Sequence, residues 1–97
     1  MATFVVLGNF TDQGIRSYKD SPKRAEAFAD VLAQSGGSLK SIYWTIGQYD
    51  VIAVVEMPDP ESATAALLQL GAAGNVRTTT LRAFDRDQFQ AIIDRSA

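Results

Sequence analysis

The 97-residue chain contains no cysteine and no histidine. Their absence excludes disulfides, thiol nucleophiles, imidazole general bases, axial histidine ligation of haem, and zinc sites built from Cys or His. We therefore expect neither a metal nor a cofactor. Basic residues are also few, because nine Lys and Arg stand against eleven Asp and Glu and leave a net charge of −2. A dedicated nucleic-acid-binding protein usually has a strongly basic face, so we expect no nucleic-acid partner.

Long hydrophobic runs are missing as well. The first apolar stretch, residues 1–9, lacks the basic start of a signal peptide and is far shorter than the ~20 residues that span a membrane. We therefore expect a cytoplasmic protein without a membrane partner. The remaining composition, 46% hydrophobic and 21% charged, is typical of a globular protein, and the length suits one domain.

Four segments are rich in the β-branched and aromatic residues that favour strands. They are residues 2–10, 39–46, 51–57 and 76–84. The first segment is apolar on both of its alternating faces, which indicates a central strand that is covered on both sides. Only residues 47–50 separate the second segment from the third, so these two strands must form an antiparallel hairpin.

Three helix starts follow from capping signals, in which a Ser or Asp side chain precedes the first helical turn. They are Ser21-Pro22, Asp59-Pro60 and a capping box of Asp85 with Gln88. The first two helices carry an apolar stripe and end at glycines, whereas the third is short and carries Phe89, Ile92 and Ile93. Ahead of the first helix, we expect residues 11–20 to be a polar loop.

The order strand, helix, strand, strand, helix, strand, helix predicts an α+β ferredoxin-like fold in one domain over residues 1–97. Right-handed crossovers place both long helices on the same face of a four-stranded antiparallel sheet. The opposite face then carries Val5, Leu7 and their neighbours, an apolar patch that monomers avoid exposing. We therefore expect a homo-oligomer, a dimer or larger, that covers this open face.

A Gly-x-Tyr-Asp sequence, Gly47-Gln48-Tyr49-Asp50, lies in the predicted hairpin turn. The flanking sequences agree with it: residues 11–16 (TDQGIR), 21–24 (SPKR), 43–46 (YWTI), 54–59 (VVEMPD) and 76–84 (VRTTTLRAF). Together these segments resemble the GYD domain proteins over nearly the whole chain. The resemblance implies similarity to dimeric α+β barrel proteins, which often pair sheet against sheet. It implies no catalytic residue and no defined biochemical role.

Tyr49 and Asp50 of this turn have two interpretations. They could form a polar pair at the mouth of a sheet-lined cavity, with Tyr49 as proton donor and Asp50 as the acceptor that orients it. They could instead belong to the hairpin, with Gly47 at positive φ, Asp50 bonded to backbone and Tyr49 over the core edge. We favour the structural role for Asp50 and a site-lining role for Tyr49.

Charged and aromatic residues within the strands are further candidates for ligand binding. If Glu56 and Arg82 share the open face, they would lie ~10 Å apart. Glu56 could then act as a base and Arg82 could hold a carboxylate. Alternatively, both could be structural charges. Tyr43 and Trp44 lie on opposite faces of one strand, and either could line a cavity or an interface. The simplest expectation for Trp44 is a place in the core.

A basic cluster surrounds the start of the first predicted helix. It comprises Arg16, Lys19, Lys23 and Arg24, opposed only by Asp20. Because helix N-termini attract anions, Arg16, Lys23 and Arg24 are candidates for binding a small phosphate or carboxylate. The alternative is a solvated surface cluster, and no P-loop motif is present.

Three functions fit these patterns. The first is an oligomeric module that binds a small molecule or assembles with other proteins, without recognisable catalytic machinery. The second is a cofactor-free enzyme of the dimeric α+β barrel kind, an oxygenase, isomerase or lyase acting on a small organic acid or phenolic compound. Its polar residues would be Tyr49, Asp50, Glu56 and Arg82. The third is a purely structural partner protein.

Overall fold

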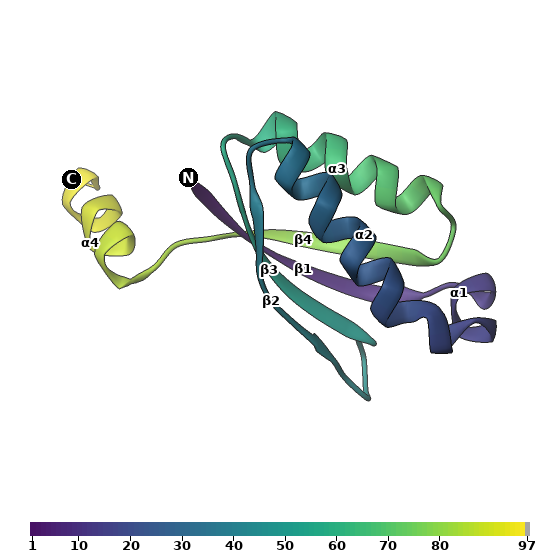
Figure 1. The fold of residues 1–97 in the computed structure, drawn as a ribbon. Coiled ribbons are helices and arrows are strands. Elements are labelled where there is room, and N and C mark those ends of the chain that lie inside the picture. The colour runs from purple at the N-terminus through teal and green to yellow at the C-terminus, as the bar shows by residue number, and fades with distance from the viewer. Residues whose placement is uncertain (97) are drawn as a thin grey trace.

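A computed structural model of the chain describes residues 1–96. Its elements are β1 (Ala2–Phe10), α1 (Asp12–Arg16), η1 (Tyr18–Asp20), α2 (Ser21–Gln34), β2 (Ser38–Trp44), β3 (Val51–Met57), α3 (Pro60–Ala72), β4 (Val76–Ala83) and α4 (Arg86–Arg95). The four strands form one antiparallel sheet in the order β2-β3-β1-β4 (Figure 1). This is the predicted ferredoxin-like order, with β3 and β4 on either side of β1.

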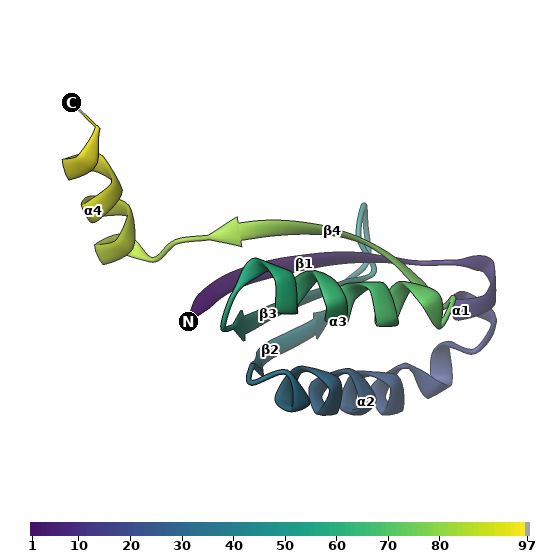
Figure 2. The ribbon, with the colours of Figure 1, turned by 90° about the horizontal axis from the view of Figure 1, so that it is seen from above.

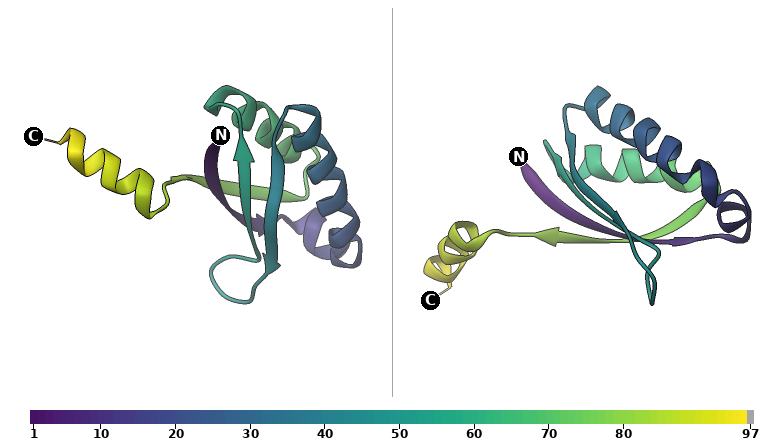
Figure 3. Two further views of the ribbon diagram at one scale, coloured as in Figure 1. Left: turned by 60° about the vertical axis from the view of Figure 1, so that its left-hand side comes forward. Right: turned by 60° about the horizontal axis from the view of Figure 1, so that its bottom comes forward.

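Both long helices cover the same face of the sheet, as predicted. Figure 3 shows α2 and α3 on one side of the strands. The core lies between this helix layer and the sheet. Its buried members are Phe4, Val6, Phe28, Leu32, Ala53, Val55, Met57, Ala63 and Ala66. Apolar residues at helical spacing on α2 and α3 therefore meet alternate residues of β1 and β3.

The other face of the sheet is built from the intervening residues. The strand register places Val5 beside Val54 and Leu81, and Leu7 beside Ile52 and Thr79. Within residues 1–96 no helix covers this face (Figure 3). We call it the open sheet face, and its large apolar members are Val5, Leu7, Tyr43, Ile52, Val54 and Leu81.

The polar loop expected at residues 11–20 is wrong, because the segment forms α1 and η1. Thr11 is the N-cap of α1, and its hydroxyl oxygen accepts a hydrogen bond from the Gly14 N–H at 3.0 Å. The same hydroxyl donates to the carbonyl of Gly74 at 2.6 Å. A bond to a residue so distant in the sequence stabilises a turn that local propensity does not reveal.

The capping signals are confirmed at two helices and wrong at one. Asp59 caps α3 by accepting from the Ser62 N–H at 2.7 Å, and this bond holds the pKa of Asp59 below its usual value. Asp85 and Gln88 form the predicted capping box of α4. Ser21, however, is the first residue of α2 rather than its cap. Its hydroxyl instead accepts from the indole N–H of Trp44 at 2.9 Å.

The C-terminal helix α4 stands clear of the rest of the structure (Figures 1 and 2). Phe89 is 55% exposed and Ile93 46% exposed, so the apolar side of α4 has no cover within residues 1–96. The Cα radius of gyration is 14.4 Å, against about 12.5 Å for a compact domain of this length. None of the helices formed by residues 1–96 combines the length and apolar character needed to cross a membrane.

Candidate functional site

The GQYD turn, residues 47–50, is fastened to the end of β1. The Asp50 carboxylate accepts from the Phe10 N–H at 2.9 Å, and the Asp50 N–H donates to the Gly8 carbonyl at 2.9 Å. The Asn9 side-chain amide donates to the Gln48 carbonyl at 2.7 Å. Asp50 therefore continues the hydrogen bonding of β1 past its last pair with β3. This geometry is that of a structural hairpin residue.

Gly47 and Tyr49 complete this turn. Gly47 has φ of 143°, and nothing lies within 4 Å of the position of an added Cβ. The left-handed backbone, rather than lack of space, therefore favours glycine here. Tyr49 is half-buried, and its carbonyl accepts from the Thr45 hydroxyl. The structure places Tyr49 outside the cavity described below, so its role in ligand binding stays a prediction.

The TDQG segment, residues 11–14, begins α1 and is hydrogen-bonded to the loop before β4. The Thr11 N–H donates to the Asn75 carbonyl at 3.0 Å, and the Gln13 amide donates to the Asn75 side chain at 3.0 Å. A Cβ on Gly14 would overlap the Asn75 carbonyl oxygen, so only glycine allows this approach. The segment thus joins the two halves of the fold and fixes the position of Asn75.

Glu56 and Arg82 do not come together, because they lie on opposite faces of the sheet. Glu56 pairs with Thr3 and points to the open sheet face, whereas Arg82 pairs with Phe4 on the helix side. The expected separation of ~10 Å required both side chains on the open sheet face, so that expectation is wrong. Glu56 has a different partner, the ammonium of Lys40 at 3.6 Å. Lys40 lies at the irregular point of the β2–β3 register.

The Arg82 guanidinium, near the end of β4, lies over two aromatic rings. It is 5.5 Å from the ring centre of Phe4 and 4.4 Å from that of Phe84. It also donates to the Thr3 carbonyl at 3.0 Å. These contacts tie β4 to β1 where the chain leaves the sheet toward α4.

The two aromatic residues of β2 point to opposite faces, as predicted. Tyr43 lies opposite Ile52 on the open sheet face and is 65% exposed. The expectation of a core position for Trp44 is wrong, since it is 44% exposed. Its indole bonds to Ser21 instead and closes the space between β2 and the start of α2.

The predicted basic cluster is divided in the structure. Arg16, Lys19 and Lys23 are exposed, whereas Arg24 is half-buried. The Arg24 guanidinium donates from Nη1 to the Ser17 carbonyl and hydroxyl, at 3.0 and 3.2 Å, and from Nη2 to the Gly14 carbonyl at 3.4 Å. Arg24 therefore holds the end of α1, and it differs from its three basic neighbours in being half-buried.

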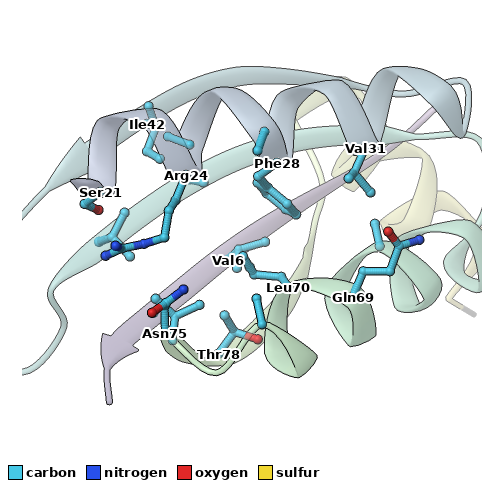
Figure 4. A pocket seen from close by; sticks show the side chains of 18 of the residues that line it. Val6, Ser21, Arg24, Phe28, Val31, Ile42, Gln69, Leu70, Asn75 and Thr78 are labelled. Carbon is cyan, nitrogen blue, oxygen red and sulfur yellow. The ribbon is translucent and has the colours of Figure 1, made fainter. Parts of the chain in front are cut away.

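A cavity of about 300 Å³ lies between α2, α3 and the helix side of the sheet (Figure 4). We call it the interlayer cavity. Its apolar walls include Val6, Phe28, Val31, Ile42 and Leu70, and its polar lining residues include Ser21, Arg24, Gln69, Asn75 and Thr78. Ser21, Arg24 and Asn75 gather at one end in Figure 4. Pockets that bind small molecules share this mostly apolar lining with a few polar groups.

Sequence reasoning missed the interlayer cavity. The only signal was the small residues among its walls, Gly8, Ala25, Ala53 and Ala66, on surfaces that face each other across the core. Alanine is equally common where helices pack closely on a sheet, so composition alone does not separate the two cases.

Comparison with known proteins gives a clear relationship. The sequence profile of the GYD domain matches residues 4–93. The chain belongs to the GYD domain family. A relative in Thermus thermophilus, described as a glutamine synthetase and cystathionine beta-lyase binding protein, is 34% identical over 84 residues. The match covers 86% of this chain and 88% of that protein.

A solved structure agrees with this assignment to the GYD family. The crystal structure of TTHA0845 from Thermus thermophilus superposes with a TM-score of 0.54 at 28% sequence identity. The superposition covers 88% of this chain and 95% of that one. The shared fold therefore extends over most of both chains.

Proposed function

We propose that this GYD domain protein is a homo-oligomeric binding module whose partner is a metabolic enzyme, either a glutamine synthetase or a cystathionine β-lyase. The observation that carries the proposal is the Thermus relative, whose name states these two partners and whose match covers 86% of this chain. Two uncovered apolar surfaces, the open sheet face and α4, support a role in protein contacts.

The open sheet face is the surface that we assign to a second copy of the chain. Leu81 is 49% exposed and Tyr43 65% exposed, on a face where Val5, Leu7 and Val54 lie between them and are half-buried. Exposed apolar patches of this kind mark protein interfaces. A self-complementary contact of about 1,000 Å² or more would suffice for a stable dimer.

α4 extends this surface. Phe89, Ile92 and Ile93 follow the i, i+3, i+4 spacing of one helical side, and all three are exposed. Since α4 is well capped but touches little else of its own domain, its apolar side needs cover from another chain. We assign it to the same second copy, so that each α4 reaches over its neighbour.

The enzyme alternative has less support, because its residues do not converge. Glu56 is ion-paired on the open sheet face, Arg82 lies on the opposite face, and Asp50 accepts from the Phe10 backbone. Chemistry on one substrate would require these groups within hydrogen-bond reach of the same atoms.

Biolayer interferometry with purified enzymes tests partner binding. The immobilised protein is exposed to glutamine synthetase and to cystathionine β-lyase from the same source organism, with an unrelated oligomeric enzyme as control. We expect saturable binding to at least one of the two and none to the control. Absence of binding to both would contradict the proposed function.

Sedimentation velocity at micromolar concentration tests the assembly separately. We expect the wild type to sediment as a dimer or larger, and Leu81→Lys on the open sheet face to shift it to monomer. The matched control is Leu68→Lys, because Leu68 is 69% exposed on α3 and lies away from that face. A wild-type monomer, or equal behaviour of the two variants, would contradict assembly through the open sheet face.

A further inference from the structure

We propose that the interlayer cavity binds a small apolar monocarboxylate, with its hydrocarbon part between α2 and the sheet and its carboxylate against Arg24. The volume of about 300 Å³ matches the lower end of small-molecule pockets, roughly 300–1,000 Å³. This site lies on the helix side of the sheet and shares no residue with the open sheet face or α4. The cavity is therefore separate from the surfaces assigned to a second copy of the chain.

The walls select an apolar ligand body. Val6, Phe28, Val31, Ile42 and Leu70 line the cavity with side chains that offer no hydrogen bond (Figure 4). Mostly apolar pockets of this kind bind ligands chiefly by removing apolar surface from water. A hydrocarbon chain or ring would therefore cover these walls.

Arg24 provides the reason for a carboxylate. Its guanidinium donates only to neutral oxygens of Gly14 and Ser17, which leaves Nε–H and one Nη2–H without a bond to residues 1–96. No carboxylate of the described chain lies within ion-pair distance of it. A half-buried arginine without a counter-charge, beside an apolar cavity, favours an anionic group that can accept two parallel N–H bonds.

The groups next to Arg24 complete the polar end. Ser21 is 9% exposed, and its oxygen accepts from the Trp44 indole, so the Ser21 hydroxyl proton remains available to donate to a ligand oxygen. Asn75, held in place by the TDQG segment, lies at the same end in Figure 4. These neighbours offer hydrogen bonds without adding a second charge, so the site suits a single carboxylate.

Trp44 gives the experiment a direct signal, since it is the single tryptophan of the chain and lines the cavity. Purified full-length protein is titrated with octanoate and with 1-octanol, its uncharged match, while Trp44 emission and the thermal midpoint are recorded. We expect a saturable response to octanoate and binding of octanol at least ten-fold weaker. No saturable change in either readout with octanoate, or equal binding of the two probes, would overturn the proposal.

Two variants separate the carboxylate contact from the apolar one. Arg24→Gln should lower octanoate affinity to that of octanol and leave octanol binding unchanged. Ala25→Leu, which fills the cavity from α2, should weaken both probes ten-fold or more. The matched control is Ala33→Leu, since Ala33 is exposed on the same helix outside the cavity and should change neither.

The proposal can still be tested if one of these variants does not fold. If Arg24→Gln unfolds because α1 loses its anchor, Ala25→Leu against Ala33→Leu still decides the case. Octanoate affinity that Ala25→Leu leaves unchanged would overturn the proposal. Loss of enzyme binding in the interferometry assay would leave this result untouched, because the titration reports on the interlayer cavity alone.

Discussion

The two faces of the sheet are made from alternate residues of the same strands, and yet they are buried to different extents. On the helix side, Phe4 and Val6 are 7% and 4% exposed beneath α2 and α3. On the open sheet face, their neighbours Val5 and Leu7 are just as apolar but remain half-buried. Hydrophobicity alone therefore does not separate the core of this domain from its proposed interface. What separates them is which face the right-handed crossovers cover.

The largest expected effect concerns the helix side. Leu32 is 1% exposed in the core, so Leu32→Ala should lower the free energy of unfolding by about 2–5 kcal/mol through lost burial and the cavity left behind. Urea denaturation monitored by circular dichroism measures it. The matched control, Leu68→Ala, should stay within about 0.5 kcal/mol because Leu68 is exposed. Similar losses for the two variants would mean that α2 does not close the core.

The next effect concerns the uncovered surfaces. Phe89→Ser in α4 should weaken self-association ten-fold or more, about 1.4 kcal/mol, because an exposed aromatic anchor is removed from the proposed interface. Concentration-dependent sedimentation measures this change. Gln90→Ser, one position along α4, is the control and should have no effect. An unchanged dimer in Phe89→Ser would remove α4 from the interface.

Asp50 tests whether the GQYD turn is structural. Asp50→Ala removes the acceptor of the Phe10 N–H and should lower the free energy of unfolding by ~1 kcal/mol. Octanoate affinity should stay the same once stability is accounted for, because Asp50 does not line the interlayer cavity. A large loss of binding at unchanged stability would instead favour a role in a site.

Features set by local sequence could be predicted, and features set by distant contacts could not. The strand faces follow from alternation, and the caps of α3 and α4 use residues within three positions of each other. α1 depends on Thr11 bonding to Gly74, and the position of Trp44 depends on Ser21. These partners are 63 and 23 residues apart. Sequence periodicity does not reveal contacts between residues that are so far apart along the chain.

The candidate site follows the same division. Glu56, Arg82 and Tyr43 stand out in the sequence as unusual strand residues, but the face that each occupies depends on the register between neighbouring strands. Arg24 is one of several basic residues near a predicted helix start. Only the packing of α2 over the sheet distinguishes it from Lys23, which is exposed. The interlayer cavity is a property of that packing.

A smaller effect is expected from pH at the start of α3. The bond from the Ser62 N–H lowers the pKa of Asp59 below its ordinary value of 3.8. A carboxylate with a lowered folded-state pKa contributes stability above the unfolded value and loses it as pH falls through the folded value. Asp59→Asn should therefore be less stable than the wild type at pH 7, and the difference should shrink at acidic pH. Unfolding curves across this range measure it, and a constant difference would contradict the assignment.

Tyr49→Phe should have the smallest effect of all. The Tyr49 hydroxyl makes no hydrogen bond within residues 1–96, and the ring is half-buried, so phenylalanine should pack in the same place. We expect the free energy of unfolding to change by less than about 0.5 kcal/mol and octanoate affinity to stay constant. Binding of the partner enzyme is the more informative measurement. If Tyr49→Phe weakened it ten-fold or more at an unchanged thermal midpoint, the hydroxyl would belong to a contact that only the complex forms. The GQYD turn would then serve both the sheet, through Asp50, and the partner, through Tyr49.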